Sequence, residues 1–335
     1  MKRYLPVLLL AALVVAVQLV LGALKAEFLL TQLTMAAYYT LVTLGLCLLM
    51  GYAGQVSLGH AGFFAIGGYT TAVLSTAGAG AAAGATAGAA LGFAPWLSLP
   101  AAVVVTAAIA LVIGVPVLRL RGHYLAMATL AFGFIVSRVI LGTALFGQAD
   151  GISDIPGIRL FAGLVLSGKR PLRVQNYYIA WALVTAGLLL AVNLIGSRVG
   201  RALRAIHGNE EAAAAMGIDV GRYKLAVFVL SAVYAGVGGA FLAHFNAGIG
   251  PGEASVMKSV RYLALVAAGG MGSPWGTVAV SAGLTFLSLR GVFGLYDDAV
   301  FGALLVAVML FAPEGLFGVV PGLRRARGAA RGGAR

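Results

Sequence analysis

The chain has 335 residues, of which 61% are hydrophobic and only 10% are charged. Soluble domains carry roughly 25% charged residues, and a soluble core of this size has no room for so much apolar surface. At about 20 residues for each membrane-spanning helix, the length allows about eight to ten crossings with short loops. The composition therefore excludes a soluble domain and indicates a membrane protein.

A net charge of +13 is compatible with nucleic-acid binding, but Lys and Arg lie in the short breaks between apolar runs. Basic residues in short loops mark the cytoplasmic side of a membrane protein, so this charge indicates topology and no nucleic-acid partner is expected. The single cysteine, Cys47, lies inside an apolar run. This excludes a disulfide framework and a CxxC metal site, and no metal or cofactor is predicted.

The amino-terminal segment has two basic residues, Lys2 and Arg3, followed by apolar residues from Leu5 to Ala23. This apolar run is longer than the roughly 7 to 15 residues of a signal-peptide core, and no A-x-A cleavage site follows it. We therefore expect an uncleaved first helix.

Apolar runs, separated by charged or Gly/Pro-rich breaks, predict ten crossings. The run at 56–76, which is rich in glycine and polar residues, and the short pair after Arg261 are the weakest, so eight or nine crossings remain an alternative. The predicted fold is an all-α, polytopic transmembrane helical bundle. Its spans are expected near residues 5–23, 29–50, 56–76, 96–118, 123–146, 176–196, 223–247, 260–274, 276–293 and 297–312.

Orientation follows when the basic clusters are placed in the cytoplasm, and with ten crossings both termini are then cytoplasmic. The predicted cytoplasmic residues are Lys2, Arg3, Arg119, Arg121, Arg198, Arg201, Arg204, Arg222, Lys224, Arg324, Arg325, Arg327, Arg331 and Arg335. The opposite side receives Asp150, Asp154, Glu253, Asp297 and Asp298, with Lys169, Arg170 and Arg173 as the basic exception.

Two low-complexity stretches interrupt this pattern. Residues 76–94 are almost entirely Ala and Gly and are expected to form an external loop or a loosely packed helix. Residues 319–335 predict a disordered, basic cytoplasmic tail close to anionic membrane lipid, because Arg alternates with Gly and Ala from Arg324 to Arg335.

The densest polar feature at membrane depth is the block from Gly51 to Tyr69, which places Gln55, Ser57 and His60 among many glycines. Polar groups at this depth are tolerated where they face protein or a water-filled path. Glycines at this density allow a broken helix beside a transport path or, equally, tight helix packing with the polar groups bonded to neighbours. Both interpretations stay open. Gly51, Gly54 and Gly59 are the predicted structural glycines of this block.

Two further features are candidates for the path. An unpaired arginine at the bilayer centre costs about 2.5–3.5 kcal/mol, so Arg138 should face protein, water or an acidic partner. Gly269, Gly270 and Gly272 predict a tight break between two short helices, with a role in hairpin geometry, gating or ligand contact.

The loop at 198–224 is longer than a connection requires. Asn209 is a plausible helix N-cap, Glu210 and Glu211 occupy the first turn where the helix dipole favours acids, and Gly217 stands just past the last turn. The pattern predicts a short capped helix outside the membrane. It is either a docking element or a solvated helix with no partner.

The run Glu211-Ala212-Ala213, three residues and Gly217 resembles the EAA-x3-G cytoplasmic loop of ABC importer permeases. In that family the short helix docks in a groove of the ATP-hydrolysing subunit. The resemblance implies that Glu210, Glu211, Ala212, Ala213 and Gly217 couple this chain to an ATPase. The longer family pattern is incomplete here, because no Leu-Pro follows Gly217.

Six ordered blocks resemble the LivM-type permeases of branched-chain amino acid ABC transporters. This resemblance implies a permease domain at 1–318 in the inner membrane of a bacterium. Its implied partners are a LivH-type permease, two cytoplasmic ATP-binding subunits and a periplasmic substrate-binding protein. The blocks lie at residues 51–69, 118–133, 200–206, 216–225, 269–276 and 313–317.

No catalytic residue or nucleotide site is predicted. The nearest phosphate-loop lookalike, at 163–170, lacks Ser or Thr after Lys169. A urea or short-amide importer of the same architecture is the first alternative function. An ion-coupled secondary transporter is disfavoured because the acidic residues lie in loops or at the ends of spans. A membrane-embedded enzyme is disfavoured because the sequence has no HExxH motif, no carboxylate pair within a span and no assignable nucleophile–base pair.

Overall fold

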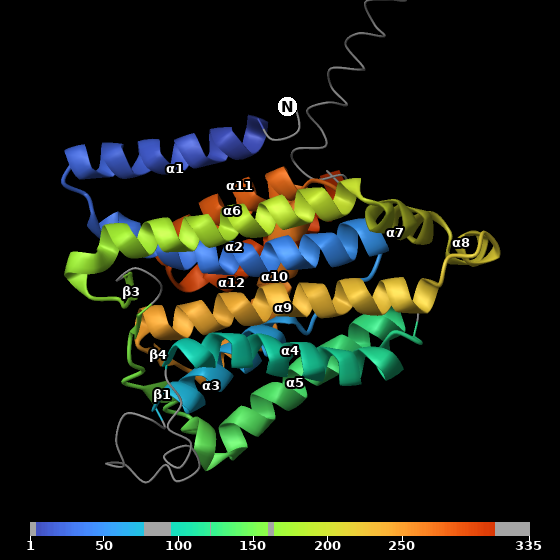
Figure 1. The fold of residues 1–335 in the computed structure, drawn as a ribbon, viewed down its shortest axis with the longest axis horizontal. Helices are drawn as coiled ribbons and strands as arrows, with labels where there is room; N and C mark the ends of the chain where they lie inside the picture. Colours follow the sequence, from blue (N-terminus) through green and yellow to red (C-terminus); the bar gives the residue numbers. More distant parts are fainter. Residues whose placement is uncertain (1–4, 77–94, 121, 160–163, 312–335) are drawn as a thin grey trace, which may run out of the picture.

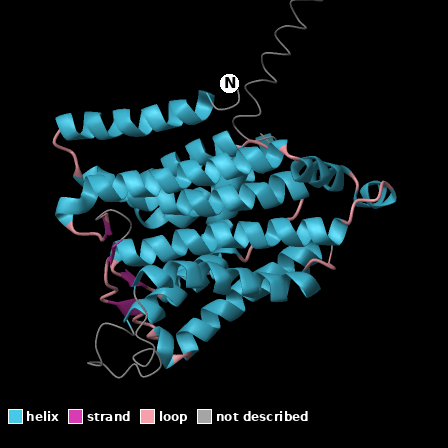
Figure 2. Ribbon diagram, viewed as in Figure 1, coloured by secondary structure: helices cyan, strands magenta, loops and turns pink. Residues whose placement is uncertain are grey.

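A computed structural model describes residues 5–76, 95–120, 122–159 and 164–311, and shows elongated helices lying side by side (Figure 1; Figure 2). The α-helices are α1 (Leu5–Ala23), α2 (Phe28–Ala53), α3 (His60–Thr76), α4 (Pro95–Val117), α5 (His123–Gly142), α6 (Arg173–Gly196), α7 (Arg198–Gly208), α8 (Glu210–Ala215), α9 (Val220–Asn246), α10 (Val256–Gly269), α11 (Pro274–Leu289) and α12 (Asp297–Phe311).

Short elements connect the helices at one end of the bundle. The pairs β1–β4 and β2–β3 are antiparallel, and they lie at the left in Figure 1, opposite α7 and α8. We call these two ends the strand end and the α7–α8 end. The short elements are β1 (Ile152–Ser153), β2 (Ile158–Arg159), β3 (Val165–Leu166), β4 (Gly248–Ile249) and the 3-10 turns η1 (Ala144–Phe146), η3 (Arg170–Leu172), η4 (Pro251–Ala254) and η5 (Gly294–Tyr296).

The predicted all-α polytopic bundle is confirmed, and each predicted span corresponds to one helix. Six segments are at least 18 residues long and apolar enough to cross a membrane: α2, α4, α5, α6, α9 and the η5–α12 segment. The apolar segments Leu9–Ala23 of α1 and Pro274–Leu289, which is α11, are shorter than this. The predictions for residues 77–94, 313–317 and 319–335 lie outside the described residues.

Several predicted span boundaries differ from the helix bounds by four or five residues, among them the end of α5, both ends of α10 and the end of α11. The third span was expected from residue 56, but α3 begins at His60 and residues 54–59 are not helical. Gly54 ends α2 in the left-handed conformation, with φ of +66°, and this conformation is readily available only to glycine. The chain therefore turns out of α2 before it re-enters the bundle as α3.

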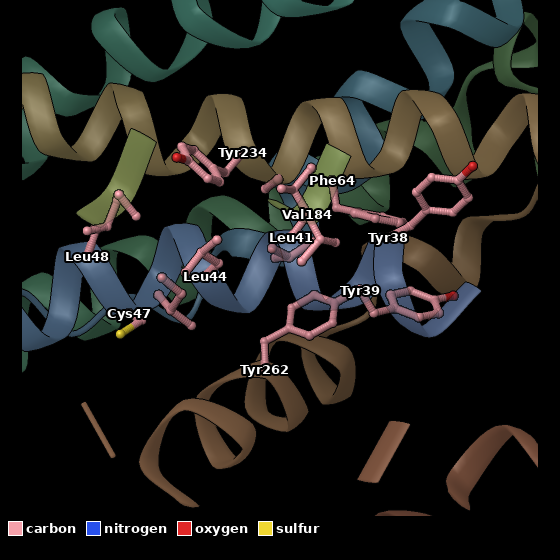
Figure 3. Packing of buried hydrophobic residues seen from close by; sticks show 14 of the residues in the cluster. Tyr38, Tyr39, Leu41, Leu44, Cys47, Leu48, Phe64, Val184, Tyr234 and Tyr262 are labelled. Carbon is pink, nitrogen blue, oxygen red and sulfur yellow. The ribbon is translucent and has the colours of Figure 1, made fainter. Parts of the chain in front are cut away.

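Helix α2 forms the centre of the fold. Its side chains are buried on all sides, as expected for a helix that is hydrophobic all round. Figure 3 shows Tyr234 of α9 on one side of α2 and Tyr262 of α10 on the other. The helices packed most extensively around α2 are α6, α9 and α11.

Helices α3 and α9 pack backbone to backbone. A methyl group added at Gly67 would overlap the backbone of Gly236, and one added at Gly239 would overlap the carbonyl of Phe64. Small residues permit this close approach, which favours helix association in a lipid environment where apolar burial alone gives little driving force.

Candidate coupling and translocation site

Two consecutive capped helices protrude at the α7–α8 end (Figure 1). Ser197 Oγ accepts hydrogen bonds from the amides of Val199 and Gly200 and begins α7. Asn209 Oδ1 accepts from the amides of Glu211 and Ala212 and begins α8. The predicted N-cap at Asn209 is therefore confirmed, with its two acids in the first turn.

The end of α8 also matches the prediction. Ala215 is its last residue, and Gly217 follows with φ of +82°. The amide of Gly217 bonds to the carbonyl of Ala214, and that of Ile218 bonds to Ala213, so the last carbonyls of α8 are satisfied. No side chain crowds Gly217, and its backbone conformation is what requires glycine here.

Helix α7 was not predicted as a separate helix. Ala202, Leu203 and Ile206 lie on its buried face, whereas Arg201 and Arg204 are exposed. The signal was present in the sequence, because apolar residues recur at a spacing of three and four from Val199 to Ile206. Helix α7 therefore fastens α8 to the membrane bundle.

An ion pair connects α8 to α9. The Lys224 ammonium pairs with the Glu210 carboxylate, although only 7% of the Lys224 side chain is exposed. Ala213 is the buried residue of α8, whereas Glu211 and Ala212 are exposed and Met216 is 83% exposed. Of the five predicted coupling residues, Glu210 and Ala213 thus face the protein, and the others offer an outward surface.

Replacing Asn209 by alanine is expected to destabilise α8 by about 0.5–2 kcal/mol, because the amides of Glu211 and Ala212 lose their acceptor. Hydrogen exchange of these amides in the purified protein measures the effect. Asn209→Asp retains an acceptor and serves as the control. Unchanged exchange in Asn209→Ala contradicts the capping role.

Helix α7 reaches the break between α2 and α3. A methyl group added at Gly54 would lie 2.9 Å from Nδ1 of His207 in α7. The predicted path residues Gln55 and Ser57 follow directly in this break. The predicted coupling loop and the break at 54–59 are far apart in the sequence but lie next to each other in the structure.

Ser57 and His60 are fully buried and bonded within the subunit. His60 Nδ1 lies 3.0 Å from Ser57 Oγ, and His60 Nε2 lies 2.6 Å from Ser231 Oγ of α9. On the α5 side, the amide of Leu58 donates to Thr129 Oγ1. The geometry favours the packing interpretation for these two residues, in which they fasten the break to α9 and α5.

His60→Ala is expected to destabilise the protein by about 1–3 kcal/mol, because it removes the ring nitrogens to which the buried hydroxyl groups of Ser57 and Ser231 bond. A double variant with Ser231→Ala should lose less than the sum of the two single effects, since the partners are shared. Thermal unfolding in detergent measures both. Additive effects contradict the bridge.

Gln55 differs from its neighbours. Its side chain is 1% exposed, yet its amide nitrogen and oxygen have no hydrogen-bond partner among the described residues. Next to it, Val56 is 40% exposed. Of the predicted path residues in the break, Gln55 is therefore the one whose side-chain amide can bond to water or to a ligand.

The structure does not bring Arg138 to these residues. Its side chain is exposed on α5, and its guanidinium carbon lies 4.8 Å from the ring centroid of Phe134. Gly133, by contrast, faces Gly59 and Gly62 on the inner side of α5. Arg138 thus lies on an outward face that also carries the exposed residues Phe134, Ile135 and Val139.

The break between α10 and α11 packs against the end of α2. A methyl group added at Gly51 would overlap the carbonyl of Met271, and Tyr52 donates to the carbonyl of Gly272 at 2.8 Å. Gly270 has φ of +94°, and Gly269 packs against the backbone of Thr277. The predicted tight hairpin at 269–272 is confirmed as a geometric element, and it lies close to α7.

The described residues line pockets at both ends of the bundle. A cavity of about 730 Å³ at the strand end is lined by Asp154, Lys169 and the end of α9. A smaller one of about 340 Å³ at the α7–α8 end is lined by Tyr52, Arg204 and Trp275. Within the described ranges, no group of three or more His, Cys, Asp or Glu residues lies close enough to hold a metal ion.

Comparison with known proteins adds an independent result. Over 324 residues, the chain is 34% identical to the high-affinity branched-chain amino acid transport system permease protein LivM of Escherichia coli, covering 89% of this chain and 72% of the relative. It is 26% identical over 301 residues to LivH of Escherichia coli, covering 85% and 92%. BraD of Pseudomonas aeruginosa is 28% identical over 304 residues, covering 85% and 93%.

No solved structure matches the chain. The family described as "Branched-chain amino acid transport system / permease component" matches residues 28–312, a range that includes the central α2, the α7–α8 end and both helix breaks. The chain is a multi-pass membrane protein and belongs to this family of permease components.

Proposed function

We propose that this chain is the permease subunit of an ATP-driven importer of branched-chain amino acids in the inner membrane. The observation that carries the proposal is the capped, protruding α8 with an exposed Glu211, Ala212 and Met216, in a chain that belongs to a permease family. The names of the relatives LivM, LivH and BraD support the substrate class.

In this proposal α8 docks on a cytoplasmic ATPase subunit, and this chain hydrolyses no ATP itself. The ion pair of Glu210 with Lys224 transmits movement of α8 to α9. The contact of His207 with Gly54 transmits movement of α7 to the break at 54–59. The basic residues Arg198, Arg201 and Arg222 near α8 support a cytoplasmic position for this end.

A second permease of the LivH type packs against the outward face of α5 in this proposal. That face is apolar at Phe134, Ile135 and Val139 but carries the charge of Arg138. A cation in lipid is costly, whereas a carboxylate or carbonyl group of a partner subunit would stabilise it. The path for the amino acid then runs between the two permeases and past Val56, and a periplasmic binding protein delivers the ligand at the strand end.

The test is purification of the full chain with an affinity tag from its host, followed by identification of the co-purified proteins and uptake of labelled leucine in a deletion strain. Two ATPase subunits and a second permease are the expected partners. Their loss in a variant carrying Glu211→Lys and Gly217→Lys, with the second permease retained, assigns the ATPase contact to α8. Uptake that continues without the ATPases refutes the proposal.

The urea or short-amide importer is distinguished by the same uptake assay. Competition of leucine uptake by isoleucine and valine, but not by urea, is expected. If uptake of labelled urea depends on this chain, urea is its substrate in place of branched-chain amino acids. The proposed coupling of α8 to an ATPase is unaffected by that result.

A further inference from the structure

The cavity of about 340 Å³ at the α7–α8 end lies where α2 and α6 end and α11 begins. Ile195 and Gly196 of α6 form one wall, and Tyr52 of α2 and Trp275 of α11 contribute aromatic rings. Arg204 of α7 adds a positive charge, and none of the described lining residues is acidic. The cavity therefore combines a cation with apolar and aromatic walls.

The Arg204 side chain keeps most of its hydrogen-bond donors free. Its Nη1 donates to the carbonyl of Ile195 at 3.2 Å, and this bond holds the guanidinium at the end of α6. An arginine has five N–H donors, and the others have no partner among the described residues. Because a planar guanidinium can bind two phosphate oxygens at once, Arg204 is anchored by one donor and able to bind an anion with the rest.

Arg204 belongs to a basic stripe on α7. Arg198, Arg201 and Arg204 recur at a spacing of three residues and are all exposed, so they lie along one side of the helix. The other side of α7 is buried at Leu203 and Ile206. The ion pairs found among the described residues involve other cations. The stripe therefore carries three positive charges that no described carboxylate neutralises.

The level of the cavity in the bilayer follows from the ends of the helices. Helix α6 is long and apolar enough to cross a membrane and ends at Gly196, and α7 begins two residues later at Arg198. An amphipathic helix with arginines on its polar face is typical of a membrane surface. Tyr and Trp are enriched at the same level, and Tyr52 and Trp275 line the cavity. The cavity therefore lies at the height of the lipid headgroups.

The cavity also lies on a side of the bundle that lipid can reach. It is lined by α6 and the start of α11, and Figure 1 shows these two helices on the side opposite α5. The second permease, placed on α5 above, leaves this side free. On α6, Leu190 is 64% exposed, five residues before Ile195 of the cavity wall. A lipid whose acyl chains lie along Leu190 can therefore place its headgroup in the cavity.

From these observations we infer that the cavity binds the phosphate headgroup of an anionic phospholipid from the surrounding bilayer. Arg204 bonds to the phosphate oxygens, and Arg198 and Arg201 attract the negative charge. The lipid bridges α6, α7 and the start of α11, and it holds α7 at the membrane surface. This inference rests on the position of the α7–α8 end at the membrane surface and is independent of the transported substrate and of the ATPase.

The test is native mass spectrometry of the purified complex, released from detergent micelles that contain a defined lipid. Phosphatidylglycerol is the anionic probe, and phosphatidylcholine with the same acyl chains is the comparison without net charge. Arg204→Gln removes the charge that lines the cavity. Arg222→Gln is the matched control, because it removes an arginine at the same end that pairs with Asp219 and does not line the cavity.

The native complex is expected to retain at least about five times more phosphatidylglycerol than Arg204→Gln, the factor expected for one arginine beside an anionic lipid. Arg222→Gln should retain as much as the native complex. Equal retention in the native complex and in Arg204→Gln overturns the inference. Displacement of the bound lipid by millimolar inorganic phosphate also overturns it, because the site then selects a soluble anion.

A second variant separates the cavity from the charge of the stripe. Gly272 lines the cavity, and a methyl group added there meets no atom within 4 Å. Gly272→Leu adds a side chain at the cavity wall and keeps all three arginines, and retention of phosphatidylglycerol should fall as far as in Arg204→Gln. Full retention in Gly272→Leu would place the lipid outside the cavity and refute the assigned site.

A comparison of the two lipids on the unaltered sequence covers the case in which a variant does not fold. The native complex is expected to retain phosphatidylglycerol in preference to phosphatidylcholine, because the unneutralised arginines favour a headgroup with a net negative charge. Equal retention of the two lipids refutes a site for an anionic headgroup.

Discussion

Replacing Glu210 by alanine is expected to lower the free energy of unfolding by about 3–5 kcal/mol, because the buried Lys224 ammonium then lacks its carboxylate partner. Lys224 is 5% exposed, so water cannot replace the lost charge. Unfolding in a mixed detergent titration measures the loss. If α8 couples this chain to an ATPase, leucine uptake should fall more than tenfold.

The control removes both charges. Lys224→Met combined with Glu210→Ala leaves no buried ion, so the double variant should regain most of the stability lost in Glu210→Ala. Uptake should remain low, because the connection between α8 and α9 is still missing. A double variant that is less stable than Glu210→Ala would contradict the ion pair as the cause.

Gly51→Ala is expected to cost at least about 1–3 kcal/mol, because the new methyl group overlaps the carbonyl of Met271 and forces α2 away from the α10–α11 break. The bond from Tyr52 to the carbonyl of Gly272 should weaken with it. Thermal unfolding and the yield of folded protein in detergent measure the effect.

Gly283→Ala in α11 is the matched control, since it makes the same substitution inside a helix with nothing within 4 Å of the added methyl group. Alanine is the better helix former by about 1 kcal/mol, so this variant should be at least as stable as the native protein. Equal losses of stability in Gly51→Ala and Gly283→Ala would show that the close approach of Met271 to Gly51 is not the cause of the destabilisation.

Gly51 and Gly283 differ in their surroundings in a way that the sequence does not reveal. Gly51 was expected to be structural because it begins a glycine-rich block, but the residue that it contacts, Met271, is 220 positions away. Periodicity and composition report on neighbours along one helix. They contain no information on which distant backbone approaches a given face.

The path residues illustrate the same limit. In the sequence, Gln55, Ser57 and His60 are alike, because all three are polar residues in one apolar block. The structure distinguishes them by the hydrogen-bond partners of their side chains. The His60 ring bonds to Ser57 and Ser231, whereas the side-chain amide of Gln55 has no partner among the described residues. Only its charge marks Arg138 as a candidate path residue in the sequence. The side of α5 on which it lies could not be predicted, because a 20-residue helix with apolar residues on all sides has no clear inner face.

The local features were predictable. The bundle followed from hydropathy, since a spanning helix must satisfy its backbone internally and present apolar side chains. The cap at Asn209 and the turn at Gly217 followed from side-chain chemistry within a few residues. Tertiary structure alone decided the pairing of Lys224 with Glu210, the contact of His207 with Gly54 and the hydrogen bond between Thr43 of α2 and Ser281 of α11. These depend on packing between helices far apart in the sequence, and membrane helices of similar hydropathy do not encode their partners in their composition.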